Sequence, residues 1–262
     1  METLVAYLGA VIPTFLLVLS RTMGLMLQAP ILSNKNLPGS VKMAVAVGLS
    51  FVIMTLLPGP VAVPDVMMLF LMMALTEFAL GAIFGYSASF MFHAFQSAGE
   101  LSGVQAGMSF ASTMNPLLKS NVNPFGTIYF NIALIMFLLI GGHLWMIGGF
   151  VQSFKLVPMG TFIMTPEVGK YFLQISGSFL AITLQLALPA VIVLFLTDLG
   201  VGYISKAAPQ ASNILELVQA IKPIAGLLLL LLLLPNLMSV THQYTEQTIR
   251  ELDTLLRLAG QR

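Results

Sequence analysis

Long runs of apolar residues, separated by short polar connections, dominate this 262-residue sequence. The extreme case is an unbroken run of leucines from Leu227 to Leu234. A helix needs about 20 apolar residues to span the hydrocarbon layer of a membrane. Six stretches reach or approach that length: 3–27, 43–63, 66–95, 127–150, 171–196 and 224–240. The sequence therefore predicts an all-α, multi-helix, membrane-associated fold, and we expect a single domain over residues 1–262.

The charge content agrees with a membrane setting and excludes several classes of function. Only 8% of the residues are charged, against about 25% in soluble domains. The net charge of +1 provides no basic face for nucleic acid. Cysteine is absent, which rules out disulfides, thiolate catalysis and cysteine-ligated metals. Lys and Arg are spread almost evenly over the two sides that six spans would create. Loop charge therefore fixes no orientation, and the helices need not form a standard six-span bundle.

After the sixth apolar stretch the sequence changes character, over residues 241–262. Charged residues appear, while Ile249, Leu252, Leu255 and Leu256 recur at helical spacing. This pattern predicts an amphipathic C-terminal helix, lying at an interface or against a partner.

Small residues at every fourth position predict close helix packing in and after the third apolar stretch. Gly81 and Gly85, and then Gly99, Gly103 and Gly107, follow this spacing. Glycine lets two helix backbones approach closely, which is how many helices associate inside a membrane. The alternative is chance, because glycine is frequent in membrane helices.

Four charged residues lie inside or beside apolar stretches: Arg21, Glu77, Asp198 and Lys222. Charges in such positions are costly and usually face a partner or a water-filled cavity. One interpretation is ion coupling in a transporter, with Arg21, Glu77 and Asp198 along the pathway. The interpretation that we favour is that these charges pair with one another or with a neighbouring subunit.

No catalytic or metal-binding motif stands out in the sequence. It lacks HExxH, a phosphate-binding loop ending in Gly-Lys-Ser/Thr, and Gly-x-Ser-x-Gly. The histidines His93, His143 and His242 are scattered without ligand spacing. Ser176 and Gly177 slightly resemble an intramembrane protease motif, but no base is placed to pair with the serine. We therefore expect no enzyme activity, no cofactor and no metal, and we rank an intramembrane hydrolase below a transporter.

The stretch "GMSFASTMNPLLKSNVNPFG", from Gly107 to Gly126, is a polar interval between apolar runs. It contains two Asn-Pro steps, and Pro116 and Pro124 oppose a regular helix. We therefore expect a loop over residues 103–126. Non-helical backbone at membrane depth is tolerated only where it is buried in protein or lines a wet cavity.

Five short sequence segments and two single residues, taken in their order along the chain, form a recognisable set. The phrases are "GLMLQAP" (24–30), "LPGSVKMAVAVGLS" (37–50), "GVQAGMSFASTMNP" (103–116), "GGHLWMIGGFVQSFKLVPMG" (141–160) and "LQLALPAVIVLFLTDLGVGYISKAAPQ" (184–210). Together with Arg21 and Lys222 they resemble the flagellar biosynthetic protein FliR family and its SctT-like counterpart in virulence type III secretion systems. The resemblance runs from Arg21 to about Leu234. One departure is Asn115, where the family commonly has an acidic residue.

The resemblance implies a core subunit of the type III protein export gate, in the bacterial inner membrane at the flagellar basal body and partly exposed towards the periplasm. Such subunits assemble with P-type and Q-type subunits into a closed complex of hairpin-like helices. That complex is the entrance of the channel for unfolded rod, hook and filament proteins. A B-type switch protein and an A-type export protein are further expected partners. The subunit itself does no chemistry.

This role gives the polar interval a function. A protein channel must pass an extended chain and still stop ions, and flexible Met and Phe side chains can seal a pore reversibly. We therefore expect a plug in the loop, while the alternative is an ordinary connection between helices. The candidate plug residues are Met108, Phe110, Met114, Asn115, Pro116, Asn123, Pro124 and Phe125.

Overall fold

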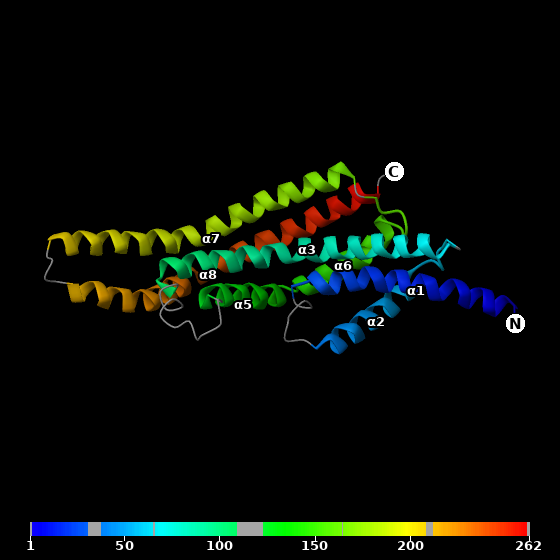
Figure 1. Cartoon of the computed structure of the whole chain (residues 1–262), viewed down its shortest axis with the longest axis horizontal. Coiled ribbons are helices and arrows are strands. Elements are labelled where there is room, and N and C mark those ends of the chain that lie inside the picture. The colour runs from blue at the N-terminus through cyan, green and yellow to red at the C-terminus, as the bar shows by residue number, and fades with distance from the viewer. Residues whose placement is uncertain are drawn as a thin grey trace. The chain divides into compact units, whose positions relative to one another are not determined.

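The computed structural model describes residues 2–30, 38–64, 66–108, 123–163, 165–207 and 212–260, without the side chains of residues 2–8, 172, 212–216 and 258–260. In these ranges the regular structure is helical, which confirms the predicted all-α fold. The helices are α1 (Glu2–Gln28), α2 (Gly39–Leu56), α3 (Met67–Gln105), α5 (Pro124–Leu139), α6 (Gly142–Leu156), α7 (Pro166–Ala207) and α8 (Ser212–Gly260) (Figure 1). Five of them are long and apolar enough to cross a membrane, and α5 and α6 taken together would make a sixth span.

The chain divides into two compact units. Unit 1 comprises residues 1–90, 141–175 and 246–262, and unit 2 comprises residues 91–140 and 176–245. Helices α3, α7 and α8 contribute a segment to each unit. They have 39, 42 and 49 residues.

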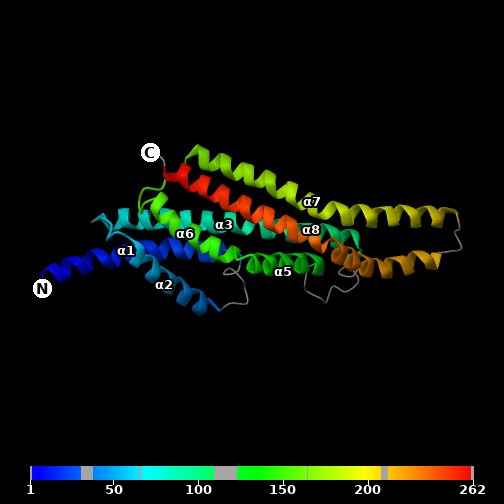
Figure 2. The same cartoon turned by 180° about the vertical axis from the view of Figure 1, so that it is seen from behind.

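In unit 1 the first two helices pack along a narrow stripe. Helix α2 buries Ala46, Ser50 and Ile53, which recur at helical spacing, and it lies beside α1 (Figures 1 and 2). The connection after α2 is tied back to α1, because the Val61 amide donates to Thr14 Oγ1 at 3.0 Å. The remaining sides of α2 are mostly apolar and exposed, with Ser40, Lys42 and Thr55 as polar exceptions.

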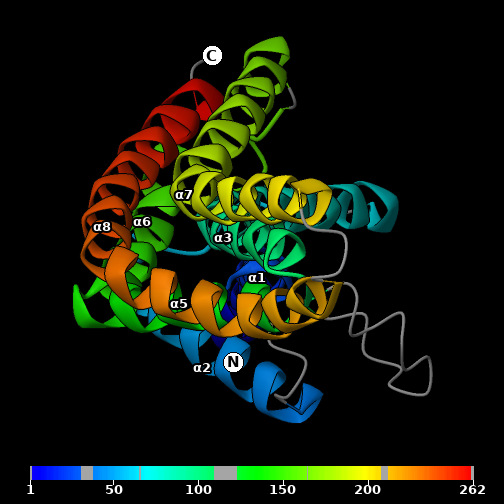
Figure 3. The same cartoon turned by 90° about the vertical axis from the view of Figure 1, so that its left-hand side faces the viewer.

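In unit 2 the second half of α3 packs against α5 and α7. Phe92 makes edge-to-face contact with Phe137, with ring centroids 5.2 Å apart, and such pairs add to simple burial. The Thr183 hydroxyl on α7 donates to the Ala94 carbonyl of α3 at 3.4 Å. Figure 3 gives a nearly end-on view of the long helices.

Two predicted apolar segments have different boundaries in the structure. The predicted segment 43–63 is helical only to Leu56, because Pro58 disfavours helical backbone at the residue before it. The predicted segment 127–150 is not one helix. Helix α5 ends at Leu139, and Gly141 has a left-handed backbone (φ +74°) before α6 begins at Gly142. Glycine adopts that conformation without steric cost, so the chain can break there.

The sixth apolar segment and the predicted C-terminal helix form one continuous element. Helix α8 runs from Ser212 to Gly260 and contains Pro223 and Pro235. The amphipathic pattern is present at its end, where Leu252, Leu255 and Leu256 are 6%, 0% and 2% exposed. These leucines are therefore buried within the chain itself, and the helix is not a separate surface element.

Helices α3 and α5 extend into the predicted loop from both ends. Helix α3 continues to Gln105 and α5 already begins at Pro124, whereas we expected a loop over residues 103–126. Proline suits the first turn of a helix, where its missing N–H group would have no partner anyway. Pro124 therefore starts a helix rather than preventing one.

Candidate functional site

Three glycines bring α1 and α3 into close backbone contact in unit 1. A Cβ atom on Gly81 would collide with the backbone of Arg21, and one on Gly85 would lie 2.8 Å from the Leu25 carbonyl oxygen. From the other side, a Cβ on Gly24 would lie 2.7 Å from the Ala82 nitrogen. Side chains at these positions would force the helices apart. The close approach of α1 and α3 therefore depends on glycine at Gly24, Gly81 and Gly85.

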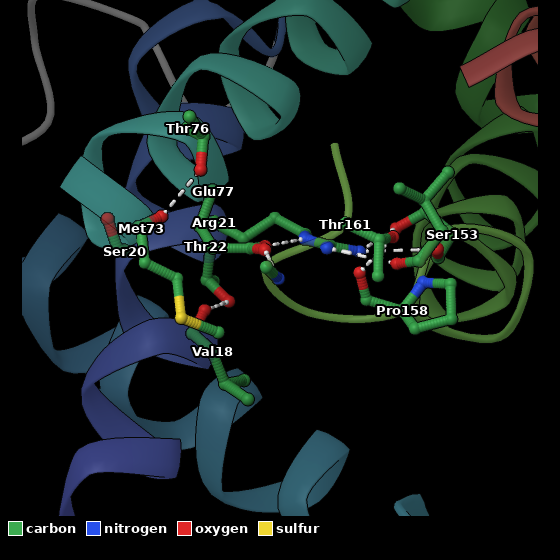
Figure 4. Close-up of polar contacts among 12 residues, drawn as sticks. Val18, Ser20, Arg21, Thr22, Met73, Thr76, Glu77, Ser153, Pro158 and Thr161 are labelled. Atoms are coloured by element: carbon green, nitrogen blue, oxygen red, sulfur yellow. Dashed lines mark hydrogen bonds and ion pairs between the residues drawn. The ribbon is translucent and has the colours of Figure 1, made fainter. Parts of the chain in front are cut away.

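This crossing places an Arg–Glu pair inside unit 1. Arg21 on α1 donates from Nε to Oε2 of Glu77 on α3 at 2.5 Å, and both side chains are 0% exposed (Figure 4). A fully buried charge is unfavourable unless it is paired and its remaining hydrogen-bonding groups are satisfied. The surroundings of the pair meet that condition.

The guanidinium of Arg21 caps the end of α6. One of its terminal nitrogens donates to the carbonyl oxygen of Ser153 at 3.2 Å (Figure 4), and the other donates to the carbonyl oxygen of Val157 at 3.1 Å. The Val157 carbonyl lies just past the end of α6, where carbonyls lack an N–H partner inside the helix and need an outside donor. The Ser153 carbonyl accepts the Val157 amide at 2.9 Å in addition to Arg21. The guanidinium carbon also lies 4.3 Å from the centre of the Phe154 ring, a favourable cation–π geometry.

Glu77 secures the turn that follows α6. Its second oxygen, Oε1, accepts the backbone N–H of Gly160 at 2.7 Å. Gly160 has a φ of +77°, which suits glycine and strains other residues. The pair thus clips three parts of unit 1 together, namely α1, α3 and the end of α6 with its following turn. We call Arg21, Glu77, Ser153, Val157 and Gly160 the buried clip.

A second charge cluster lies in unit 2 and is more exposed. Lys222 on α8 donates to Oδ1 of Asp198 on α7 at 2.7 Å, with side chains 5% and 33% exposed. Gln105, the last residue of α3, donates from Nε2 to Oδ2 of the same aspartate at 2.8 Å. We call these three residues the outer cluster. It joins α7, α8 and the end of α3, directly before the polar interval.

The other end of the polar interval is held against α3. Asn123 caps α5, because its Oδ1 accepts the Phe125 amide at 3.0 Å, and its Nδ2 donates to the Glu100 carbonyl at 3.1 Å. A Cβ on Gly103 would collide with the Asn123 side chain, and one on Gly99 would lie 2.5 Å from the Phe125 carbonyl oxygen. Gly99 and Gly103 therefore permit close contact between α3 and α5.

The predicted plug residues fall into three groups. Phe110, Met114, Asn115 and Pro116 lie outside the described residues. Met108 is described, directly after Gly107, whose φ of +83° ends α3. Asn123, Pro124 and Phe125 belong to the start of α5, and Phe125 is 2% exposed. Phe125 therefore takes part in the packing of unit 2, and the plug role of these residues stays a prediction.

The charges were predicted to pair with one another or with a neighbouring subunit, and the structure pairs all four within the chain. Arg21 and Glu77 are 0% exposed in the single chain, and the assignment of the four charges as subunit contacts stays a prediction. Sequence reasoning missed Gln105, Ser153 and Gly160 as partners. A polar residue at a helix end is a weak signal, and backbone partners leave no trace in the sequence.

The described residues contain no group of three or more His, Asp or Glu side chains that could hold a metal ion. His93, His143 and His242 lie on α3, α6 and α8. In the buried clip the charged groups bond to one another and to backbone groups, and in the outer cluster Asp198 bonds to Lys222 and Gln105. Both arrangements hold helix segments together.

Comparison with known proteins identifies the family. The sequence model of the bacterial export proteins, family 1, matches residues 12–248. The chain is 34% identical over 197 residues to the flagellar biosynthetic protein FliR of Escherichia coli K12, covering 74% of each chain. The chain belongs to the FliR family of bacterial export proteins. It also shares 25% identity over 251 residues with FliR of Bacillus subtilis, covering 95% of this chain and 96% of that one.

The similarity extends to the virulence branch. The Yop proteins translocation protein T of Yersinia pestis is 30% identical over 232 residues, which cover 86% of this chain and 87% of the relative. Membership in the FliR family makes the chain a subunit of a flagellar or type III protein export apparatus with several membrane-spanning helices. The matched residues, 12–248, include both charge clusters and both ends of the polar interval.

Proposed function

We propose that this FliR-family chain is a core subunit of the flagellar type III export gate. In this proposal it assembles with P-type and Q-type subunits into the entrance of the channel that exports unfolded rod, hook and filament proteins. Its place is the bacterial inner membrane at the basal body, partly exposed towards the periplasm. The B-type switch protein and the A-type export protein are its further partners. The match of the family over residues 12–248 is the observation that carries the proposal.

The charge clusters support a structural role in such a gate. An ion-coupled transporter needs charges that can bind and release an ion along a wet path. Here Arg21 and Glu77 are fully buried and bonded to each other and to backbone groups. A clip of this kind stabilises an arrangement of helices, as a subunit of a closed complex requires.

Deletion and complementation test this function. A strain that lacks the gene should export no hook or filament protein and should be non-motile, and the intact chain should restore both. Tagged chain should co-purify with the P-type and Q-type subunits. Normal motility and secretion in the deletion strain would overturn the proposal.

We further propose that the polar interval acts as the plug of the gate. Its lack of acidic side chains and its Met and Phe content suit a soft seal that neither binds a substrate chain nor admits ions. Its two ends are held by the outer cluster and by Asn123. Deletion of residues 108–121 should make the inner membrane leak ions or small molecules. If the deletion causes neither a leak nor an export defect, the assignment of the polar interval as a plug is wrong.

The transporter alternative makes the opposite prediction for the charges. If Glu77 and Asp198 lined an ion pathway, Glu77→Gln and Asp198→Asn would abolish uptake of a solute and leave motility intact. The export proposal predicts instead that any activity these two substitutions reduce is protein export, and with it motility. Immunoblots of the assembled complex separate a defect in export from a failure to assemble.

A further inference from the structure

Four segments of the chain pass from one unit to the other, and three of their ends lie together within unit 2. The crossings fall between residues 90 and 91 in α3, 140 and 141 between α5 and α6, 175 and 176 in α7, and 245 and 246 in α8. The Thr245 hydroxyl donates to Sδ of Met91 at 3.7 Å, and the Thr241 hydroxyl donates to Sδ of Met136 at 3.6 Å. Threonine–methionine contacts therefore join the ends of the α3, α5 and α8 segments.

The packing beside these crossings is adaptable. Met91 and Met136 are 3% and 8% exposed, so both thioethers lie inside unit 2. A methionine side chain is unbranched and flexible, and it can fill a space whose shape changes. The buried clip of unit 1 differs, because it holds its helices through charged hydrogen bonds that demand a defined geometry.

Three of the crossings carry an interruption or a weak point of the helix itself. Between α5 and α6, Gly141 has a left-handed backbone with a φ of +74°. In α3 the Ser87 hydroxyl donates to the Ile83 carbonyl at 2.9 Å, and in α8 the Thr245 hydroxyl donates to the Thr241 carbonyl at 2.7 Å. Hydroxyl groups that bond to a carbonyl of the preceding turn slightly destabilise a helix and often bend it.

The weak point of α7 is Gly177, the second residue of that helix within unit 2. A Cβ atom there would meet nothing within 4 Å, so no close approach of another described part of the chain requires glycine at this position. Glycine in a helix interior is less favourable than alanine, because it loses more backbone freedom on folding. Gly177 therefore loosens α7 next to the crossing without a gain in packing.

We propose that the four crossings form a hinge, at which the helices bend when the export gate opens, so that the orientation of unit 1 to unit 2 changes. The inference rests on the proposed export function, because a gate needs a closed and an open arrangement. Hinges are a few positions that absorb changes of backbone angle between bodies that stay rigid. Weakened helices and adaptable methionine packing provide such positions, and the buried clip keeps unit 1 rigid.

Spin labels on the assembled export complex measure this motion, since the chain itself has no cysteine and those of the partner subunits can be replaced. One label pair, Phe51→Cys with Leu231→Cys, joins unit 1 to unit 2. The control pair, Phe51→Cys with Leu144→Cys, lies within unit 1. The three native side chains are 67%, 64% and 65% exposed. If a label at Phe51 prevents assembly, Met68, which is 63% exposed and also in unit 1, replaces it in both pairs.

Distances are recorded in an idle complex and in one that holds an export substrate stalled by a fused folded domain. The distance distribution of the pair that joins the units should differ between the two states, while that of the control pair stays the same. Equal distributions for the joining pair in both states would overturn the hinge. A change in the control pair would show that unit 1 deforms as well, which contradicts motion between rigid bodies.

The substitution Gly177→Ala tests the crossing of α7. The added methyl group has room and favours straight helix, so the bent state should become about fivefold less populated. The rate of secretion should fall by a similar factor while the complex assembles normally. The matched control is Gly200→Ala in the same helix, away from the crossing, where a Cβ would also meet nothing within 4 Å. That variant should secrete at the native rate, and equal rates for the two variants would exclude α7 from the hinge.

A second variant, Thr245→Val, tests the crossing of α8 if Gly177→Ala fails to assemble. It removes the hydroxyl bond to the Thr241 carbonyl at nearly unchanged volume, and it should slow secretion in the same way. Native secretion by this variant would exclude α8 from the hinge.

Secretion by the unmodified chain separates this inference from the proposed function. If that chain fails to restore secretion to a deletion strain, the export function itself is wrong. If it restores secretion and the distance between the units is the same in the idle and the stalled complex, only the hinge is wrong.

Discussion

The two charge clusters differ in how far their charged side chains are removed from water. In unit 1, Arg21 and Glu77 are both 0% exposed, and neighbouring backbone groups use their remaining hydrogen-bonding capacity. In unit 2, Lys222 is 5% exposed and Asp198 is 33% exposed. A charge out of reach of water depends wholly on its partners, whereas a partly exposed carboxylate can be hydrated when its partner is lost. The buried clip should therefore be rigid, and the outer cluster should tolerate change.

The largest expected effect is that of Glu77→Ala. The substitution leaves the Arg21 guanidinium buried without its counter-charge and removes the acceptor of the Gly160 amide, at a cost of about 3–5 kcal/mol. Thermal unfolding of the purified protein in detergent, together with its yield in the membrane, would measure the loss. The control is the double variant Arg21→Met, Glu77→Met, which removes both charges and should recover much of the stability. A single variant as stable as the native protein would refute the buried clip.

Gly81→Ala tests the crossing that brings the pair together. The added methyl group would collide with the backbone of Arg21, and backbone cannot move aside as a flexible side chain can, so we expect a loss of about 3 kcal/mol. The matched control is Gly48→Ala on α2, whose Cβ would meet nothing within 4 Å. That change should be neutral or stabilise the helix by up to about 1 kcal/mol. Equal melting temperatures for the two variants would contradict the close crossing.

The outer cluster should respond asymmetrically to its two single substitutions. Asp198→Ala leaves the nearly buried ammonium of Lys222 without a partner, at a cost of about 1–2 kcal/mol. Lys222→Met should cost less, because Asp198 is one-third exposed and can be hydrated. Denaturation curves of both variants in the same detergent would show the order. The reverse order would mean that the aspartate is more deeply enclosed than its exposure indicates.

The smallest effect is expected at the end of α8. Arg257 and Asp253 form an exposed pair one turn apart, with a distance of 2.8 Å and side chains 63% and 39% exposed. Such pairs contribute about 0.3–0.5 kcal/mol and are weakened by salt. Arg257→Gln should therefore leave the melting temperature almost unchanged. A loss comparable to that of Asp198→Ala would show that this pair carries more than an ordinary surface interaction.

The polar interval shows where sequence reasoning reached its limit. The two Asn-Pro steps predicted an interruption of the helices, and α3 and α5 do end and begin around it. The bounds were wrong, because Pro124 occupies the first turn of α5 and Asn123 caps it. Proline opposes a helix interior and favours a helix start. The sequence did contain a signal for this helix start, because Pro124 directly precedes the apolar run that begins at Phe125.

The sequence by itself determined the all-α fold, the membrane setting and the family. Runs of about 20 apolar residues can be satisfied only by helices when water is absent, because each backbone polar group must find its partner within the segment. The phrases that carry the family resemblance are likewise local and ordered along the chain. The spacing of Gly81 and Gly85 is local in the same way, and it can be read from the sequence alone.

Only the tertiary structure decided which charges meet and what they hold. Arg21 and Glu77 are 56 positions apart, and the carbonyl groups that Arg21 caps are at Ser153 and Val157. Every residue has a backbone carbonyl, so nothing in the sequence marks these two as acceptors. The division of α3, α7 and α8 between two units also depends on contacts between distant segments. A helical pattern fixes a helix locally, but the partners of its faces follow from packing, which is a property of the whole chain.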